Sequence, residues 1–97
     1  MANTYDIGDL VRVSATFSQG GTATDPSTVT ARYRDPSGTT TTLVYGADEA
    51  LTRDSEGVYH TDVDANRAGI WWYRFESTGS GQAATEGAFR VRASMFV

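Results

Sequence analysis

The sequence predicts an all-β domain, an antiparallel sandwich of about seven strands, from three observations. Apolar and polar residues alternate with a period of two along most of the chain. Turn-forming residues recur roughly every 8–12 positions, which is too close for the helices that connect parallel strands. No segment has the apolar spacing of an amphipathic helix. At 97 residues the chain is expected to form a single domain, residues 1–97.

The first half of the chain contains four expected strands. Their ranges are 5–7, 10–17, 27–34 and 39–45. In the second of these, Val11, Val13, Ala15 and Phe17 share one face. Residues 18–26 form a loop by composition, and 35–38 fits a type I turn because it has aspartate first, proline second and glycine fourth. The threonine-rich segment 39–45 is typical of a half-exposed edge strand.

The second half contains three more strands, at 58–63, 70–76 and 84–93. A loop at 46–50, a turn at 54–57 that could close a short hairpin, a compact corner at 64–69 and a flexible connection at 77–82 separate them. In the strand 70–76, Trp71, Tyr73 and Phe75 point to one face, and Ile70, Trp72, Arg74 and Glu76 point to the other. Three rings in alternation indicate the core-facing side. The expected core neighbours are Val29, Ala31, Tyr33, Phe89 and Val91.

Composition excludes several classes of function. The chain has no cysteine, so disulfides and thiolate zinc sites are excluded. Its net charge of −4 disfavours nucleic acid as a partner, although all eight basic residues are arginine. No apolar run approaches the roughly 18 residues that span a bilayer, so no membrane partner is expected. The N-terminal residues lack the basic and apolar regions of a signal peptide.

No group of residues specifies a reaction, a cofactor or a metal. His60 is the only histidine, so a transition-metal site is not expected. A Ser-His-Asp set lacks a nucleophile-elbow sequence to support it. The carboxylates near 48–49, 54–56 and 62–64 suit turns and caps, and a weak calcium site in a loop is left open. The glycine pairs open no helix and so form no phosphate cradle. The sequence therefore predicts a protein that is not an enzyme.

Five segments together resemble the small immunoglobulin-like proteins of tailed bacteriophages and prophages, and they cover nearly the whole chain. They are Tyr5-Asp-Ile-Gly-Asp-Leu-Val-Arg-Val-Ser-Ala-Thr-Phe17, Arg34-Asp-Pro-Ser-Gly38, Arg53-Asp-Ser-Glu-Gly-Val-Tyr-His60, Ala68-Gly-Ile-Trp-Trp-Tyr-Arg-Phe75 and Glu86-Gly-Ala-Phe-Arg-Val-Arg92. The chain departs from antibody-type domains because it lacks their cysteine pair and has Tyr33 where they usually bury a tryptophan.

The resemblance implies an immunoglobulin-like sandwich and a structural role without catalysis. Such proteins decorate capsids, form head or neck fibres, or are appended to tail proteins. The implied location is the virion, assembled in the host bacterial cytoplasm. The implied partners are other virion proteins of the capsid, neck or tail, or a second copy of the chain. Two alternatives stay open: an adhesin that binds carbohydrate or a host surface with Trp72 as a stacking platform, and a domain of a bacterial surface protein.

An immunoglobulin-like arrangement would place 27–34, 70–76 and 84–93 side by side in one sheet. The outer face of that sheet would then carry the candidate partner-binding residues Arg32, Arg34, Trp72, Arg74, Arg90 and Arg92. Tryptophan and arginine are the residues most enriched at interface hot spots. The alternative is that the arginine side chains only cover the sheet, stack on Trp72 and pair with Glu76 and Glu86.

The C-terminal residues are a second candidate docking element. Met95, Phe96 and Val97 are consecutive apolar residues beyond the last expected strand. We expect them to dock on a neighbouring subunit. The alternative is that they continue as a terminal strand on the core of their own domain.

Overall fold

The computed structural model describes residues 4–96, and within that range it is all-β with no helix. Ten strands follow one another along the chain. They are β1 (Thr4–Asp6), β2 (Leu10–Thr16), β3 (Ser18–Gln19), β4 (Thr22–Ala23), β5 (Thr28–Arg34), β6 (Thr40–Val44), β7 (Leu51–Ser55), β8 (Val58–Asp64), β9 (Gly69–Thr78) and β10 (Ala84–Arg92). Seven of them coincide with the seven strands expected from the sequence.

The strands form one large sheet, one small sheet and a short two-stranded ribbon. The large sheet has the order β1-β10-β9-β5-β6, the small sheet has the order β2-β8-β7, and β3 pairs with β4. All pairs are antiparallel except β1 with β10, which run parallel. The expectation of a purely antiparallel fold was therefore wrong at the β1 edge of the large sheet. There the first strand, β1, pairs with the last strand, β10, and both run in the same direction.

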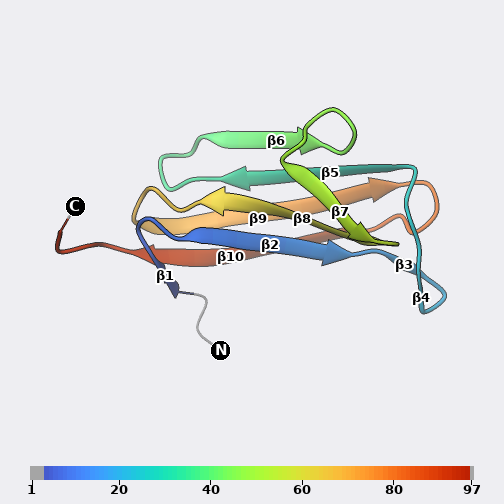
Figure 1. Cartoon of the computed structure of the whole chain (residues 1–97), viewed down its shortest axis with the longest axis horizontal. Helices are drawn as coiled ribbons and strands as arrows, with labels where there is room; N and C mark the ends of the chain where they lie inside the picture. Colours follow the sequence, from blue (N-terminus) through green and yellow to red (C-terminus); the bar gives the residue numbers. More distant parts are fainter. Residues whose placement is uncertain (1–3, 97) are drawn as a thin grey trace.

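The two sheets lie face to face around one core, with β2 and β8 over β10 and β9 in Figure 1. The small sheet contributes the predicted face of β2, and the large sheet contributes Trp71, Phe75, Phe89 and Val91. Trp71 stacks on Phe89 with 5.8 Å between ring centroids. Tyr33 and Tyr73 are half-buried and pack against this core. The prediction of which residues face inward is confirmed, and Tyr33 and Tyr73 lie at the edge of the core.

The corner before β9 fixes the direction of that strand. Ala65 is fully buried, and its backbone exchanges hydrogen bonds with the β1–β2 turn: Gly8 N donates to Ala65 O, and Ala65 N donates to Asp9 O, each at 3.0 Å. Trp71 Nε1 donates to the carbonyl of Arg67 at 3.1 Å. These hydrogen bonds hold the corner against the β1–β2 turn and against β9. As a result, Trp71 points to the inner face of β9 and Trp72 points to the outer face.

Three short strands, β3, β4 and β7, were not assigned as strands from the sequence. β7 lies where only a short hairpin was suggested, and β3 with β4 lies in the expected loop 18–26.

The carboxylate of Asp25 connects the segment after β4 to β7 and β8. It accepts hydrogen bonds from Arg53 Nη2 and Gly57 N at 2.8 Å each, and from Tyr59 Oη at 3.1 Å. These donors, Arg53 first, lower the pKa of Asp25 to about 2.

Candidate functional site

The outer face of the large sheet gathers the arginines and the tryptophan that the sequence singled out. β10, β9 and β5 are adjacent in the sheet, as expected. In the register of β5 and β9, Arg34 lies opposite Trp72, and Arg32 lies opposite Arg74. In the register of β9 and β10, Arg90 lies opposite Ile70. The residues therefore form one continuous surface, which we call the outer face.

The charges near the middle of the outer face are paired. Arg32 and Arg74 are cross-strand neighbours, an arrangement in which like charges repel. Glu76 relieves this repulsion because it forms ion pairs with both, at 3.5 Å from Arg74 Nε. Arg74 Nη1 also lies 3.3 Å from Glu86 Oε1. The alternative in which arginines only cover the sheet predicted pairing with Glu76 and Glu86. That pairing is present at Arg32 and Arg74.

Two other arginines on this face have no carboxylate partner among residues 4–96. Arg34 donates from Nε to the hydroxyl of Thr40 at 2.9 Å, and Thr40 is held in place by β6. This bond orients the guanidinium without neutralising it. Arg90 forms no ion pair with any residue in the described part of the chain. Two positive charges on this face are therefore not neutralised by carboxylates within residues 4–96.

The outer face also exposes apolar surface. Trp72 is 53% exposed and Ile70 is 45% exposed, and they are successive outward residues of β9. The outward position follows from strand alternation, because Trp71 on the other side of the same strand fills the core. Exposed apolar side chains in isolation are ordinary on protein surfaces. Here an exposed ring and an arginine without a carboxylate partner among residues 4–96 occupy opposite positions on adjacent strands, and tryptophan and arginine are the residues most enriched at interface hot spots.

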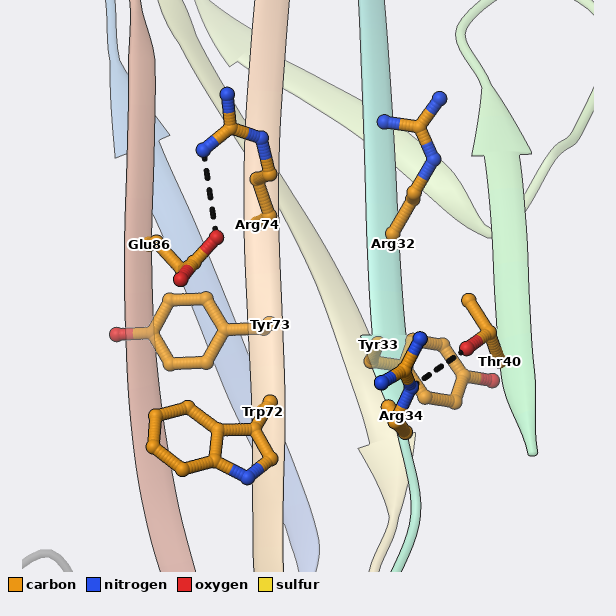
Figure 2. A pocket seen from close by; sticks show the side chains of 8 residues that line it. All are labelled: Arg32, Tyr33, Arg34, Thr40, Trp72, Tyr73, Arg74 and Glu86. Carbon is orange, nitrogen blue, oxygen red and sulfur yellow. Dashed lines mark hydrogen bonds and ion pairs between the residues drawn. The ribbon is translucent and has the colours of Figure 1, made fainter. Parts of the chain in front are cut away.

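A hollow of about 420 Å³ lies between these side chains. Figure 2 draws the residues that line it. Arg32 and Arg74 stand at one end, and Arg34 and Trp72 stand at the other, on the neighbouring strands β5 and β9. Its lining residues are Arg32, Tyr33, Arg34, Thr40, Trp72, Tyr73, Arg74 and Glu86. The hollow has the size of a small binding site, in the usual range of roughly 300–1,000 Å³. Three lining residues were not among the predicted site residues: Tyr33 and Tyr73 were assigned to the core face, and Thr40 to an edge strand.

Charge is segregated between this face and the rest of the molecule. The outer face carries five arginines and three carboxylates, a net charge of +2. The rest of the chain carries the other three arginines and nine carboxylates, a net charge of −6. The five arginines are Arg32, Arg34, Arg74, Arg90 and Arg92, and the three carboxylates are Asp6, Glu76 and Glu86. A face of opposite sign to its protein favours an acidic partner.

Arg92 is the candidate residue that belongs least to the hollow. It lies at the end of β10 and forms an ion pair with Asp6 of β1 across the parallel pairing. This contact lowers the pKa of Asp6 and raises the pKa of Arg92, chiefly through the hydrogen bond between them. Its visible role is to hold β1 on the sheet.

The C-terminal candidates lie apart from the core. Met95 and Phe96 are 95% and 94% exposed, and the segment runs away from the end of β10 in Figure 1. These two residues therefore do not continue as a strand on their own domain. Val97 lies outside the described residues. Exposure leaves Met95 and Phe96 accessible to a neighbour, and docking on one remains a prediction.

Among residues 4–96, His60 and the carboxylates are the remaining candidates for chemistry. His60 is buried, and its Nδ1 lies 2.8 Å from Asp54 Oδ2 on the adjacent strand. Within residues 4–96, no three histidine, cysteine or acidic side chains are grouped so as to hold a metal ion. The described chain also contains no helix long and apolar enough to cross a membrane.

Comparisons of this chain with protein-family models, with curated proteins and with solved structures gave no match. Its function is therefore argued from the geometry and chemistry of the outer face.

Proposed function

We propose that this chain is a non-enzymatic structural protein of a phage virion, with an immunoglobulin-like fold, that docks on other virion subunits through its outer face. Three features support this proposal: the order of the strands, the charge segregation and the exposed tryptophan. The resemblance to immunoglobulin-like phage proteins supplies the virion as the setting. The charge segregation is the observation that carries the docking role.

The strand order supports the immunoglobulin-like assignment. In chain order, β2, β7 and β8 form one sheet, and β5, β6, β9 and β10 form the other. This corresponds to the immunoglobulin division into a B-E-D sheet and a G-F-C sheet extended by one further strand. β1 pairing in parallel with the last strand fits the same plan. Stacked aromatic rings of the large sheet, Trp71 on Phe89, fill the core of a chain that lacks the inter-sheet disulfide of antibody domains.

The outer face has the composition that docking requires. Its excess positive charge steers an acidic surface toward it, and Trp72 with Ile70 supplies apolar area to bury on contact. Each single contact of this kind is weak, because exposed ion pairs contribute about 0–1 kcal/mol. Many copies on one particle would make such contacts effective together through avidity.

Copy number in purified particles tests the virion assignment. Quantitative mass spectrometry of particles from a strain that carries the gene should find the chain at a number related to the particle's symmetry. Hundreds of copies would indicate capsid decoration, and a dozen or fewer would indicate the neck or tail. Complete absence from intact particles would contradict the proposal.

A carbohydrate-binding adhesin is the second candidate function, and the hollow beside the Trp72 ring is the observation that favours it. A sugar stacked on this ring would quench the fluorescence of Trp72 and leave that of buried Trp71 unchanged. Sugar-dependent quenching that Trp72→Phe removes would establish the adhesin in place of subunit docking.

A further inference from the structure

The hollow contains an excess of one positive charge. Arg32 and Arg74 are balanced by Glu76 and Glu86, and Arg34 is left without a carboxylate among residues 4–96. The Nε of Arg34 is occupied by Thr40, so its two terminal nitrogens are free of any hydrogen bond within the described chain. In Figure 2 this guanidinium leans toward Thr40 of β6, and the indole of Trp72 extends from β9 toward β10, on the side away from Arg34. The charge excess matches a ligand with a single carboxylate and does not match a polyanion.

The outward-facing hydroxyl and carboxylate groups around the hollow are already engaged, whereas the hydroxyl groups of Tyr33 and Tyr73, which also line it, form no hydrogen bond within residues 4–96. Thr40 Oγ1 accepts from Arg34, Glu86 accepts from Arg74, and Glu76 pairs with Arg32 and Arg74. Recognition of a sugar needs several free donors and acceptors for its hydroxyl groups. Apart from these two hydroxyl groups, whose side chains pack against the core, the hollow offers one oriented cation and one open indole. These groups suit a carboxylate next to an aromatic or other apolar side chain.

We propose that the hollow binds an acidic side chain and an aromatic side chain two residues apart in an extended segment of the partner protein. The carboxylate pairs with Arg34, and the aromatic ring packs on Trp72. Arg34 and Trp72 are directly opposite on adjacent strands, which lie about 4.8 Å apart. Residues i and i+2 of an extended chain point the same way and lie roughly 6.7 Å apart. Because the Trp72 ring extends away from Arg34 in Figure 2, the two groups are farther apart than their strands, and a segment that crosses β5 and β9 can place one side chain on each.

This inference rests on the proposed function, because it names the chemistry of the partner at the outer face. A hollow of about 420 Å³ has room for both side chains. The net charge of +2 on the face and −6 elsewhere favours an acidic partner.

Three capped tripeptides test the inference on the full chain. The probe is acetyl-Asp-Gly-Phe-amide, and its matched controls are the Asn-Gly-Phe and Asp-Gly-Ala peptides, each titrated while amide, indole and arginine Nε signals are followed by NMR. The probe should shift the Trp72 indole and Arg34 Nε signals and leave Trp71 unmoved. Replacing aspartate with asparagine should weaken binding about two- to fivefold, the range for an exposed ion pair. Removing the ring should weaken it roughly three- to tenfold.

Variants locate the site. Arg34→Gln should abolish the preference for aspartate over asparagine, and Trp72→Ala should abolish the preference for phenylalanine over alanine. Arg12→Gln on the small sheet is the matched control and should change neither preference. Equal binding of the aspartate and asparagine peptides, shifts confined to other residues, or self-association of the chain through this face at the same concentrations would each overturn the inference. Tighter binding of glucuronate than of the probe would overturn it in favour of a glycan.

The two proposals can fail separately. If the tripeptide does not bind, and the Trp72→Ala/Arg74→Glu variant is nevertheless lost from particles, then docking stands and the acidic–aromatic motif is wrong. If the tripeptide binds at the hollow but that variant is incorporated normally, then docking through the outer face is wrong.

Discussion

Replacing Trp71 with alanine should destabilise the protein far more than the same change at Trp72, the next residue. Trp71 is 3% exposed, stacks on Phe89 and donates a hydrogen bond from Nε1 to the carbonyl of Arg67 at 3.1 Å. Its truncation removes the buried ring, leaves a cavity between the sheets and leaves that carbonyl without its donor. Buried tryptophan-to-alanine changes cost about 3–5 kcal/mol. Domains of this size have free energies of unfolding of about 5–15 kcal/mol.

The assays are urea unfolding and thermal unfolding of both variants, each followed by circular dichroism. Trp71→Ala should lower the free energy of unfolding by about 3–5 kcal/mol and the Tm by roughly 12–40 °C. Trp72 is 53% exposed on the outer face, so Trp72→Ala should change stability by about 0.5 kcal/mol or less. A Trp71→Ala variant that melts near the wild type, or a larger loss for Trp72→Ala, would refute the assignment of the two faces.

Three further predictions concern the other end of the core and its pH dependence. Gly57 has a φ of +76°, and a Cβ there would lie 2.5 Å from the carbonyl oxygen of Phe17, so Gly57→Ala should cost about 2–4 kcal/mol in urea unfolding. Gly38→Ala has a φ of +94° but open space around it, so it should cost only about 1–2 kcal/mol; equal losses would exclude the clash. The pKa of Asp25 is lowered from 3.8 to about 2 in the folded state, so its stabilisation is present above pH 4 and is lost as the pH falls toward 2. The urea midpoint of Asp25→Asn should therefore decline less over that interval than the wild-type midpoint, and parallel declines would refute the clamp. Thr61 Oγ1 is buried with no hydrogen-bond partner in the described chain, so Thr61→Val should raise the free energy of unfolding by about 1 kcal/mol, and a loss of stability would indicate a missed partner.

The faces of the strands could be predicted because alternation is a strong signal where one side is buried. Val11, Val13 and Ala15 alternate with polar residues, and the structure buries all three. The side-by-side placement of β5, β9 and β10 followed from the hypothesis of an immunoglobulin-like arrangement, and the strand order and register confirm the placement. The resulting outer face could therefore be anticipated residue by residue.

Other features depend on contacts between distant residues, which alternation does not report. β7 has one buried residue, Leu51, and it is held by the long-range ion pair of Arg53 with Asp25. β1 pairs in parallel with β10 across nearly the whole chain length. At the candidate site, the pairing of arginines with Glu76 and Glu86 was weighed from the sequence. The sequence did not indicate that Arg34 would be left without a carboxylate and oriented by Thr40.

The most direct test of docking through the outer face is the copy number of variants in purified particles. Trp72→Ala/Arg74→Glu removes the exposed ring and reverses one charge on that face, and Arg12→Glu makes the same charge change on the small sheet. With expression and folding matched by circular dichroism, quantitative mass spectrometry should show the double variant reduced at least about tenfold in particles, the loss expected when a hot-spot residue is removed. Arg12→Glu should be incorporated as the wild type is. Equal incorporation of the double variant and the wild type would contradict docking through this face.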